Sequence, residues 1–95
     1  MENQMLQWLN INGYFAFKPF DQALYQDGAY KKRQGQIRGV SDIVAVKDGQ
    51  VYFIEVKNEI GKQSTYQKAF EKQIKDHGGM YSLVRSLKEL KKWLQ

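Results

Sequence analysis

The sequence predicts an α/β fold, a mixed β-sheet with helices on both faces, in the order α-β-β-β-α-β-α. The first observation is a hairpin. Residues 40–47 (VSDIVAVK) and 50–57 (QVYFIEVK) have the composition of strands, and Asp48-Gly49 between them is a strong turn signal because both residues tolerate positive φ. The second observation is that both faces of this hairpin are apolar, so both need cover. One face carries Val44, Val46, Val51 and Phe53, and the other carries Ile43, Ala45, Tyr52, Ile54 and Val56.

The segment before the hairpin supplies a helix, a short strand and a long loop. Residues 2–12 place apolar side chains at near-helical spacing, and Gly13 ends the helix. These side chains are Met5, Leu6, Trp8, Leu9 and Ile11. Residues 14–18 (YFAFK) form a strand that stops before Pro19. Residues 21–38 are polar and predict a long loop, which in a compact domain is usually functional or mobile.

The segment after the hairpin supplies a helix, a strand and a last helix. Ser64 or Thr65 caps the first helix, which runs to about His77 and ends at two glycines. Its inner side carries Tyr66, Ala69, Phe70 and Ile74. Residues 80–85 (MYSLVR) form a third core strand, and a right-handed crossover makes it parallel to strand 50–57. Ser86 and Glu89 form a capping box for the last helix. That helix buries Leu87, Leu90, Trp93 and Leu94.

Composition narrows the class of protein. The 95 residues predict one domain, 1–95, and no apolar run approaches the roughly 20 residues that cross a membrane. The N-terminus lacks the basic start and apolar stretch of a signal peptide. The absence of cysteine excludes disulfides and thiolate metal sites and favours an intracellular location. The net charge of +5 favours a polyanionic partner, because cations placed against phosphates release condensed counterions.

Two carboxylates and an ammonium converge at one end of the predicted hairpin. If Asp48 and Gly49 are the whole turn, Lys47 pairs with Gln50, and Asp42 lies directly across from Glu55. Side chains alternate along a strand, so Lys57 shares the face of Glu55 while Val56 points the other way. Like charges opposed on a sheet are destabilising unless a cation neutralises them. Aspartate and glutamate oxygens suit Mg²⁺ or Mn²⁺, and such a cation polarises a phosphodiester and acidifies water. Lys57 would then orient that water or stabilise charge on the phosphorane.

An ordinary ion-pair ladder facing solvent is the alternative interpretation of these charges, and such a ladder contributes little to stability. An E-x-K triplet by itself is common. The aspartate in register and the apolar neighbours on the same face, Val44 and Phe53, favour the metal site, because a solvated ladder does not need them. The catalytic residues predicted from the hairpin are therefore Asp42, Glu55 and Lys57, with Asp42 and Glu55 as metal ligands, and Gln67 is the next catalytic candidate.

Several further polar residues have both a functional and a structural interpretation. Gln67 lies in the first turns of the helix after Lys57, where its amide can hold a water or a phosphate oxygen. Gln63 and Gln73 are alternatives with more ordinary explanations. Glu2 favours a helix dipole but can also reach the metal. His77 precedes two glycines and is better explained as neutralising a helix C-terminus than as a base.

A basic stretch leads directly into the Asp42 strand. Lys31, Lys32, Arg33 and Arg38 suit gripping phosphates beside the cut, and a solvated loop explains any one of them equally well. Trp8 and Trp93 fit helical apolar stripes and belong to the core. The sequence has no Ser/His/Asp or Cys/His set and no Gly-rich phosphate loop. We therefore expect neither covalent catalysis nor an organic cofactor.

The order of these motifs resembles the PD-(D/E)xK nuclease superfamily, and within it a stand-alone VRR-NUC domain (virus-type replication-repair nuclease). The resemblance spans nearly the whole chain. It comprises Glu2 before a helix ending at Gly13, then Gly39-Val40-Ser41-Asp42-Ile43, Phe53-Ile54-Glu55-Val56-Lys57, Gly61, Ser64, Gln67, Phe70, Gly78 or Gly79, and Tyr81-Ser82-Leu83-Val84. The superfamily often has proline at the position of Ser41, which sets strand entry and is not part of the chemistry.

The resemblance implies a restriction-endonuclease-like fold and a metal-dependent DNA endonuclease. It implies that Asp42, Glu55 and the Val56 carbonyl bind Mg²⁺ or Mn²⁺, that Lys57 is catalytic, and that Gln67 and Glu2 complete the pocket. Similar minimal domains occur in phage-like genomes and act on branched DNA such as Holliday junctions. The resemblance thus implies a homodimer in the cytoplasm of a bacterium or of a phage-infected host, since symmetric junction cleavage needs two sites related by a two-fold axis.

Two other functions stay open at the level of sequence. A non-catalytic DNA-binding module would use the basic loop for phosphates and the carboxylates for a structural cation. A flap or plain-duplex nuclease, including a restriction-type enzyme, is the other. Restriction enzymes usually need extra sequence to recognise bases, and 95 residues leave little room for it.

Overall fold

The computed structural model describes residues 1–19, 25–26, 29–30 and 37–95. The helices are α1 (Glu2–Ile11), α2 (Thr65–Asp76) and α3 (Leu87–Leu94). The strands are β1 (Phe15–Phe17), β2 (Tyr25–Gln26), β3 (Ala29–Tyr30), β4 (Ile43–Lys47), β5 (Gln50–Val56) and β6 (Met80–Val84). The predicted order of the main elements is confirmed. Within the described residues, no helix is long and apolar enough to cross a membrane.

The main sheet has the strand order β1-β4-β5-β6. β1 and β5 pair antiparallel with β4, whereas β6 pairs parallel with β5, as the predicted crossover requires. The hairpin register runs from Lys47↔Gln50 to Ile43↔Ile54. Its turn places Asp48 at φ 52° and Gly49 at φ 78°, the two positive values of a type I′ turn. The two-residue turn and its register are therefore as predicted.

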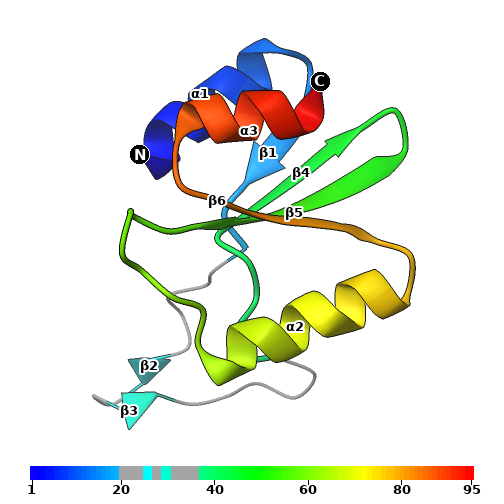
Figure 1. Cartoon of the computed structure of the whole chain (residues 1–95). Helices are drawn as coiled ribbons and strands as arrows, with labels where there is room; N and C mark the ends of the chain where they lie inside the picture. Colours follow the sequence, from blue (N-terminus) through cyan, green and yellow to red (C-terminus); the bar gives the residue numbers. More distant parts are fainter. Residues whose placement is uncertain (20–24, 27–28, 31–36) are drawn as a thin grey trace.

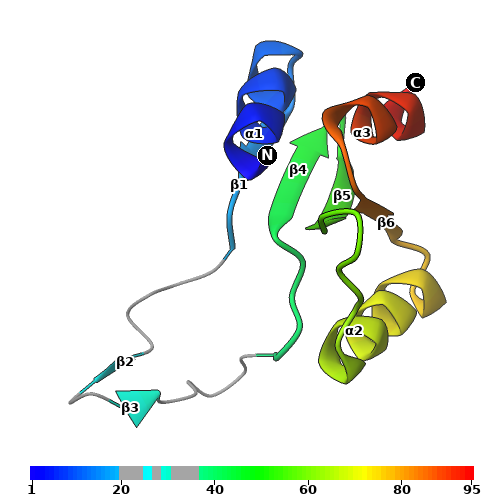
Figure 2. The same cartoon turned by 60° about the vertical axis from the view of Figure 1, so that its left-hand side comes forward.

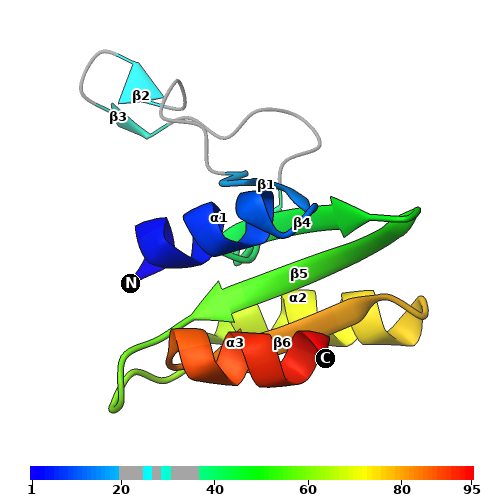
Figure 3. The ribbon, with the colours of Figure 1, turned by 90° about the horizontal axis from the view of Figure 1, so that it is seen from above.

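Helices cover both faces of this sheet. α1 and α3 lie together on one face and α2 lies on the other, and the two views agree (Figures 1 and 3). The face under α1 and α3 holds the largest buried apolar cluster, against which Trp8 and Trp93 pack as predicted. That cluster consists of Met5, Leu9, Ala16, Ile43, Ala45, Ile54, Val84 and Leu90. The face under α2 holds Phe53 and Tyr81, which both pack against Phe70. The Phe53 and Phe70 rings meet edge-on, with their centroids 5.5 Å apart.

Three residues predicted for the core lie at the surface. Ile11 is 82% exposed, because it follows the buried Leu9 by two helical positions and so points away from the core. Tyr66 is 49% exposed and Ala69 is also exposed. The Tyr66 ring stacks under the Arg38 guanidinium, 4.0 Å from its centroid, instead of packing on the sheet. Only Phe70 is buried on α2.

The segment predicted as a loop, residues 21–38, contains a small second sheet. β2 and β3 pair antiparallel, Tyr25 with Tyr30 and Gln26 with Ala29 (Figure 2). The intervening Asp27-Gly28 is the same turn dipeptide as in the main hairpin, a local signal that the loop prediction left unused. Lys31, Lys32 and Arg33 lie outside the described residues.

The helix caps agree with the sequence in most respects. Ser64, not Thr65, is the N-cap of α2. At α3 the Ser86 hydroxyl accepts from the Glu89 N–H at 3.1 Å. The reciprocal bond of the predicted capping box is displaced by one residue, because the Glu89 carboxylate accepts from Arg85 N–H at 2.8 Å. A helix end is satisfied either way.

Candidate active site

The entry to β4 is held against the start of α2. Gly39 has φ 83°, and a Cβ there would lie 2.3 Å from the backbone carbonyl of Tyr66. Only glycine fits such an approach. Ser41 is buried, and its hydroxyl donates to the Ile43 carbonyl at 3.1 Å. Together these residues fix how the chain enters β4, and β4 therefore begins at Ile43, later than the predicted residue 40.

Asp42 lies one residue before β4, in the position that continues the hairpin register opposite Glu55. Its Oδ2 accepts a 2.7 Å hydrogen bond from the Val56 N–H. A side-chain oxygen thus takes the place of a backbone carbonyl at the end of the antiparallel ladder. This bond fixes Asp42 beside the Glu55-Val56-Lys57 triplet.

Glu55 is fully enclosed, with 0% of its surface exposed, on the face of β5 that carries Phe53. Its Oε2 accepts from the Tyr81 hydroxyl at 3.3 Å, while Oε1 has no donor among the described residues. Burial is the main cause that raises the pKa of Glu55 to about 8. The neighbouring Asp42 carboxylate raises this pKa further, whereas Lys57 and Tyr81 lower it. Without a cation, Glu55 is therefore mostly protonated at neutral pH.

Lys57 follows the last residue of β5, and its N–H donates to the Val84 carbonyl at 3.1 Å. Its aliphatic stem lies against Gly61, where a Cβ would meet the Lys57 Cβ and Cδ at 3.4 Å. Arg85 holds the loop between them by donating to the carbonyls of Asn58 at 2.6 Å and Gly61 at 2.9 Å. The Lys57 ammonium is close enough to Glu55 to lower its pKa.

Glu2 lies at the start of α1, across an open hollow from Lys57. It lines an open hollow of about 380 Å³ together with Lys18, Val56, Lys57 and Asn58. Its carboxylate pairs with Lys18, 3.3 Å away. The structure thus brings Glu2 to a hollow that Val56 and Lys57 line and that Asp42 and Glu55 do not, with Lys18 as a partner that the sequence did not reveal.

The three glutamines have different surroundings. The Gln67 Oε1 accepts from the Ser64 N–H at 2.8 Å, completing a capping box, so only its NH₂ end is left to meet a ligand. The backbone carbonyl of Gln73 accepts at 2.7 Å from the ring Nδ1 of His77, which is the C-cap residue of α2. Gln63 donates to the Tyr81 hydroxyl at 3.1 Å and so connects to Glu55 through one residue. Of the three glutamines, Gln63 is therefore the one that hydrogen bonds link to Glu55, although it was predicted only as an alternative to Gln67.

Tyr81 is the residue at this site that sequence reasoning assigned only to a strand. It is 6% exposed, pairs with Phe53 in the parallel ladder and so shares the face of Glu55. Burial raises the pKa of its hydroxyl, and the charge of Glu55 adds to the shift, so Tyr81 stays protonated. The signal was present, because the predicted crossover fixes parallel pairing and alternation then selects the face.

Arg38 is the one predicted phosphate contact within the described residues. Its guanidinium donates to the Tyr66 hydroxyl at 3.0 Å while stacking on the same ring. This places a cation at the exposed N-terminal turn of α2, next to the loop that leads to Asp42.

The donor set fits a divalent cation held by few protein ligands. The described residues contain no cluster of three or more histidine, cysteine or acidic side chains. Two carboxylates are nevertheless together, and one of them has a buried oxygen without a donor in the part of the chain that the structure describes. A Mg²⁺ or Mn²⁺ ion takes one or two carboxylates and fills its remaining positions with water and phosphate oxygens. Asp42 and Glu55 are therefore the residues that could hold such a cation.

Comparisons with known proteins support the fold. No protein family and no curated protein matches this chain in sequence. A solved structure described as a VRR_NUC domain has a similar fold, with a TM-score of 0.70 and 20% sequence identity. The similarity covers 98% of this chain and 88% of that one. At this identity it shows the fold, so the nuclease-like fold predicted from the resemblance is confirmed.

Proposed function

We propose that this chain is a divalent-metal-dependent DNA endonuclease that hydrolyses phosphodiester bonds. The observation that carries the proposal is the enclosed Glu55 carboxylate, which lies beside Asp42 and Lys57 and has one oxygen that receives no hydrogen bond from any described residue. Burying two carboxylates together is costly unless a cation balances them. The similarity to a VRR_NUC domain and the net charge of +5 support the same conclusion.

Each residue has a proposed task. Asp42, Glu55 and the Val56 carbonyl hold Mg²⁺ or Mn²⁺, and Asp42 is set in place by the Val56 N–H. When bound, such a cation withdraws charge from the phosphodiester and acidifies the attacking water. Lys57 orients that water or stabilises charge on the phosphorane oxygens. Gln67 offers its NH₂ to a water or phosphate oxygen, and Glu2 joins the pocket if Lys18 releases it.

The proposed substrate is branched DNA such as a Holliday junction, cut by a homodimer. A symmetric junction presents two equivalent strands, so two copies related by a two-fold axis would place one site at each. Arg38, with Lys31, Lys32 and Arg33 from the preceding segment, would contact the backbone. The sedimentation of the free chain tests the dimer directly.

A cleavage panel tests the proposal. Linear, nicked, flapped and four-way DNA are incubated with Mg²⁺ or Mn²⁺ and the wild-type chain, Glu55→Gln or Lys57→Ala. Both variants are expected to lose cleavage by about 10³-fold or more, because each removes a group that acts on the reacting phosphate. Lys62→Ala, an exposed lysine in the loop before α2, is the matched control and should cut normally.

Binding without turnover on every substrate would select the alternative, a non-catalytic DNA-binding module. Full activity in Glu55→Gln or Lys57→Ala would show that the assigned residues are not catalytic. Preference for flapped or linear DNA would leave the chemistry in place and exclude the junction as substrate.

A further inference from the structure

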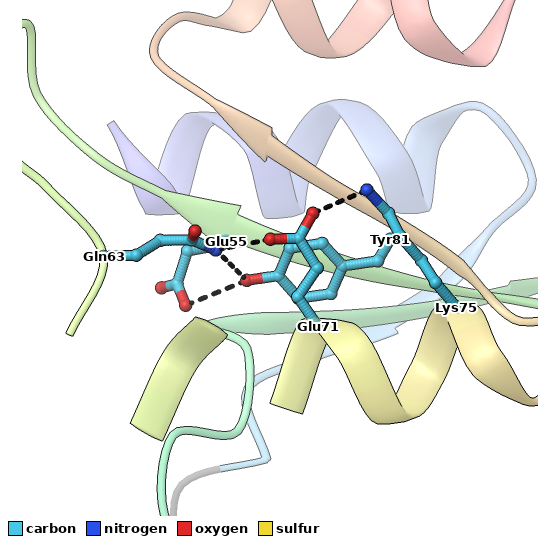
Figure 4. Close-up of polar contacts among 5 residues, drawn as sticks. All are labelled: Glu55, Gln63, Glu71, Lys75 and Tyr81. Atoms are coloured by element: carbon cyan, nitrogen blue, oxygen red, sulfur yellow. Dashed lines mark hydrogen bonds and ion pairs between the residues drawn. The ribbon is translucent and has the colours of Figure 1, made fainter. Parts of the chain in front are cut away.

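A chain of hydrogen bonds runs from the surface of α2 to Glu55 (Figure 4). Lys75 donates to Glu71 Oε2 at 2.6 Å, and Gln63 Nε2 donates to Glu71 Oε1 at 3.0 Å. The same Gln63 nitrogen donates to the Tyr81 hydroxyl at 3.1 Å, and that hydroxyl donates to Glu55 Oε2 at 3.3 Å. Helix α2, the loop residue Gln63 and strand β6 are therefore linked to one oxygen of Glu55, and Tyr81 makes the direct contact.

The chemistry of these groups sets the direction of every bond. A carboxylate only accepts, so the NH₂ end of Gln63, and not its carbonyl, must face Glu71. Lys75 keeps Glu71 ionised, because its hydrogen bond is the main cause that lowers the pKa of Glu71. The second hydrogen of the Gln63 amide then goes to the Tyr81 oxygen. The phenolic hydrogen of Tyr81 is left to point at Glu55.

The two oxygens of Glu55 consequently differ. Oε2 is held by Tyr81, while Oε1 has no donor among the described residues. We propose that Tyr81 and Gln63 are positioning residues that fix the Glu55 carboxylate by Oε2, so that Oε1 is presented, with Asp42, to a divalent cation. This inference rests on the proposed function. It assigns a task to two residues that do not touch the reacting groups.

A purely structural role for Tyr81 makes a different prediction. Its ring packs against Phe70, with centroids 6.2 Å apart, and phenylalanine keeps that contact. Tyr81→Phe therefore removes one oxygen and leaves the packing in place. Gln63→Met removes the amide at similar volume and frees the Tyr81 hydroxyl to turn.

The experiment has one readout without metal and one with it. Side-chain NMR couplings of Glu55 report whether its carboxylate holds one rotamer, and calorimetry measures Mn²⁺ affinity. We expect Tyr81→Phe to average the Glu55 rotamers and to weaken Mn²⁺ binding about 10-fold, the low end for partners that orient metal ligands. Gln63→Met should act in the same direction by about 3-fold, since the Tyr81 hydroxyl survives. At saturating Mn²⁺ the kcat of both variants should lie near the wild-type value.

Tyr52→Phe is the matched control, because this tyrosine lies on the same strand, β5, but packs on the opposite face against Trp93. It should change neither readout. A single Glu55 rotamer together with wild-type Mn²⁺ affinity in Tyr81→Phe would overturn the positioning role. If the wild-type chain binds no Mn²⁺, the proposed function is wrong, and the NMR comparison alone decides whether Tyr81 and Gln63 hold Glu55.

Discussion

Ile54 and Glu55 are neighbours on β5 and both are 0% exposed, yet they point to opposite faces of the sheet. Ile54 lies among the apolar side chains under α1 and α3. Glu55 lies on the α2 side, with Phe53 two residues before it and Tyr81 on the next strand. Burying an isoleucine stabilises a fold by about 2 kcal/mol, whereas burying a carboxyl with an unsatisfied oxygen costs free energy.

The two faces of the sheet therefore contribute differently to stability and to the proposed activity. The face under α1 and α3 is built as an ordinary core. The face under α2 buries the ionisable side chain of Glu55, which lowers stability. A well-packed apolar residue of similar volume would replace it without loss of stability. Natural proteins keep such a group where activity needs it, and a variant that stabilises the fold while abolishing activity is the expected signature.

The largest effect on stability is expected when the apolar face is broken. Ile54→Ala should lower the free energy of unfolding by about 4 kcal/mol, from lost transfer energy and the cavity left behind. This is a large share of the roughly 5–14 kcal/mol that stabilises a chain of 95 residues. Urea unfolding followed by circular dichroism measures it. Ile54→Val removes one methylene and should cost about 1 kcal/mol, and equal costs for the two variants would contradict a tightly packed face.

The contact between the β4 entry and α2 should be nearly as sensitive. Gly39→Ala adds a Cβ at positive φ and 2.3 Å from the Tyr66 backbone, so we expect a loss of about 3 kcal/mol. Gly49→Ala is the control, since φ there is also positive but nothing lies within 4 Å. That variant should lose only about 1 kcal/mol, from backbone strain alone. Similar losses in both would mean that α2 yields easily to the added methyl group.

A change in stability of opposite sign is expected at Glu55. The pKa of Glu55 is raised from 4.5 to about 8 on folding, so the unfolded chain releases this proton first as pH rises. The free energy of unfolding should therefore fall between pH 4.5 and 8. Glu55→Gln removes this loss and should be more stable than wild type at pH 8.

Thermal unfolding at pH 5 and pH 8 in the absence of divalent metal measures this pH dependence of stability. The stability difference between wild type and Glu55→Gln should be larger at pH 8. Added Mn²⁺ should stabilise the wild type and leave Glu55→Gln nearly unchanged, because a ligand stabilises only the state that binds it. A wild-type chain whose stability does not depend on pH in this range would argue against the raised pKa.

The sequence alone was sufficient for the elements of the main sheet, its helices and the hairpin, but not for the small sheet of β2 and β3. Asp48-Gly49 and the alternation of apolar residues are local signals, and they determined the turn, the register and the face shared by Phe53 and Glu55. The order and spacing of the motifs, which resemble those of VRR-NUC domains, were enough to predict the fold. These features depend on residues close together along the chain, or on a pattern that survives when most of the sequence changes.

Only the tertiary structure decided what surrounds each of those residues. It enclosed Glu55 completely, placed the Tyr81 hydroxyl on its Oε2 and Gln63 on that hydroxyl, paired Glu2 with Lys18 and drew the side-chain carbonyl of Gln67 into a helix cap. Tyr81 and Glu55 are 26 positions apart, and their contact depends on how β6 docks beside β5. Burial and side-chain partners arise from such long-range packing, so a local pattern identifies a carboxylate but not the hydrogen bonds that orient it.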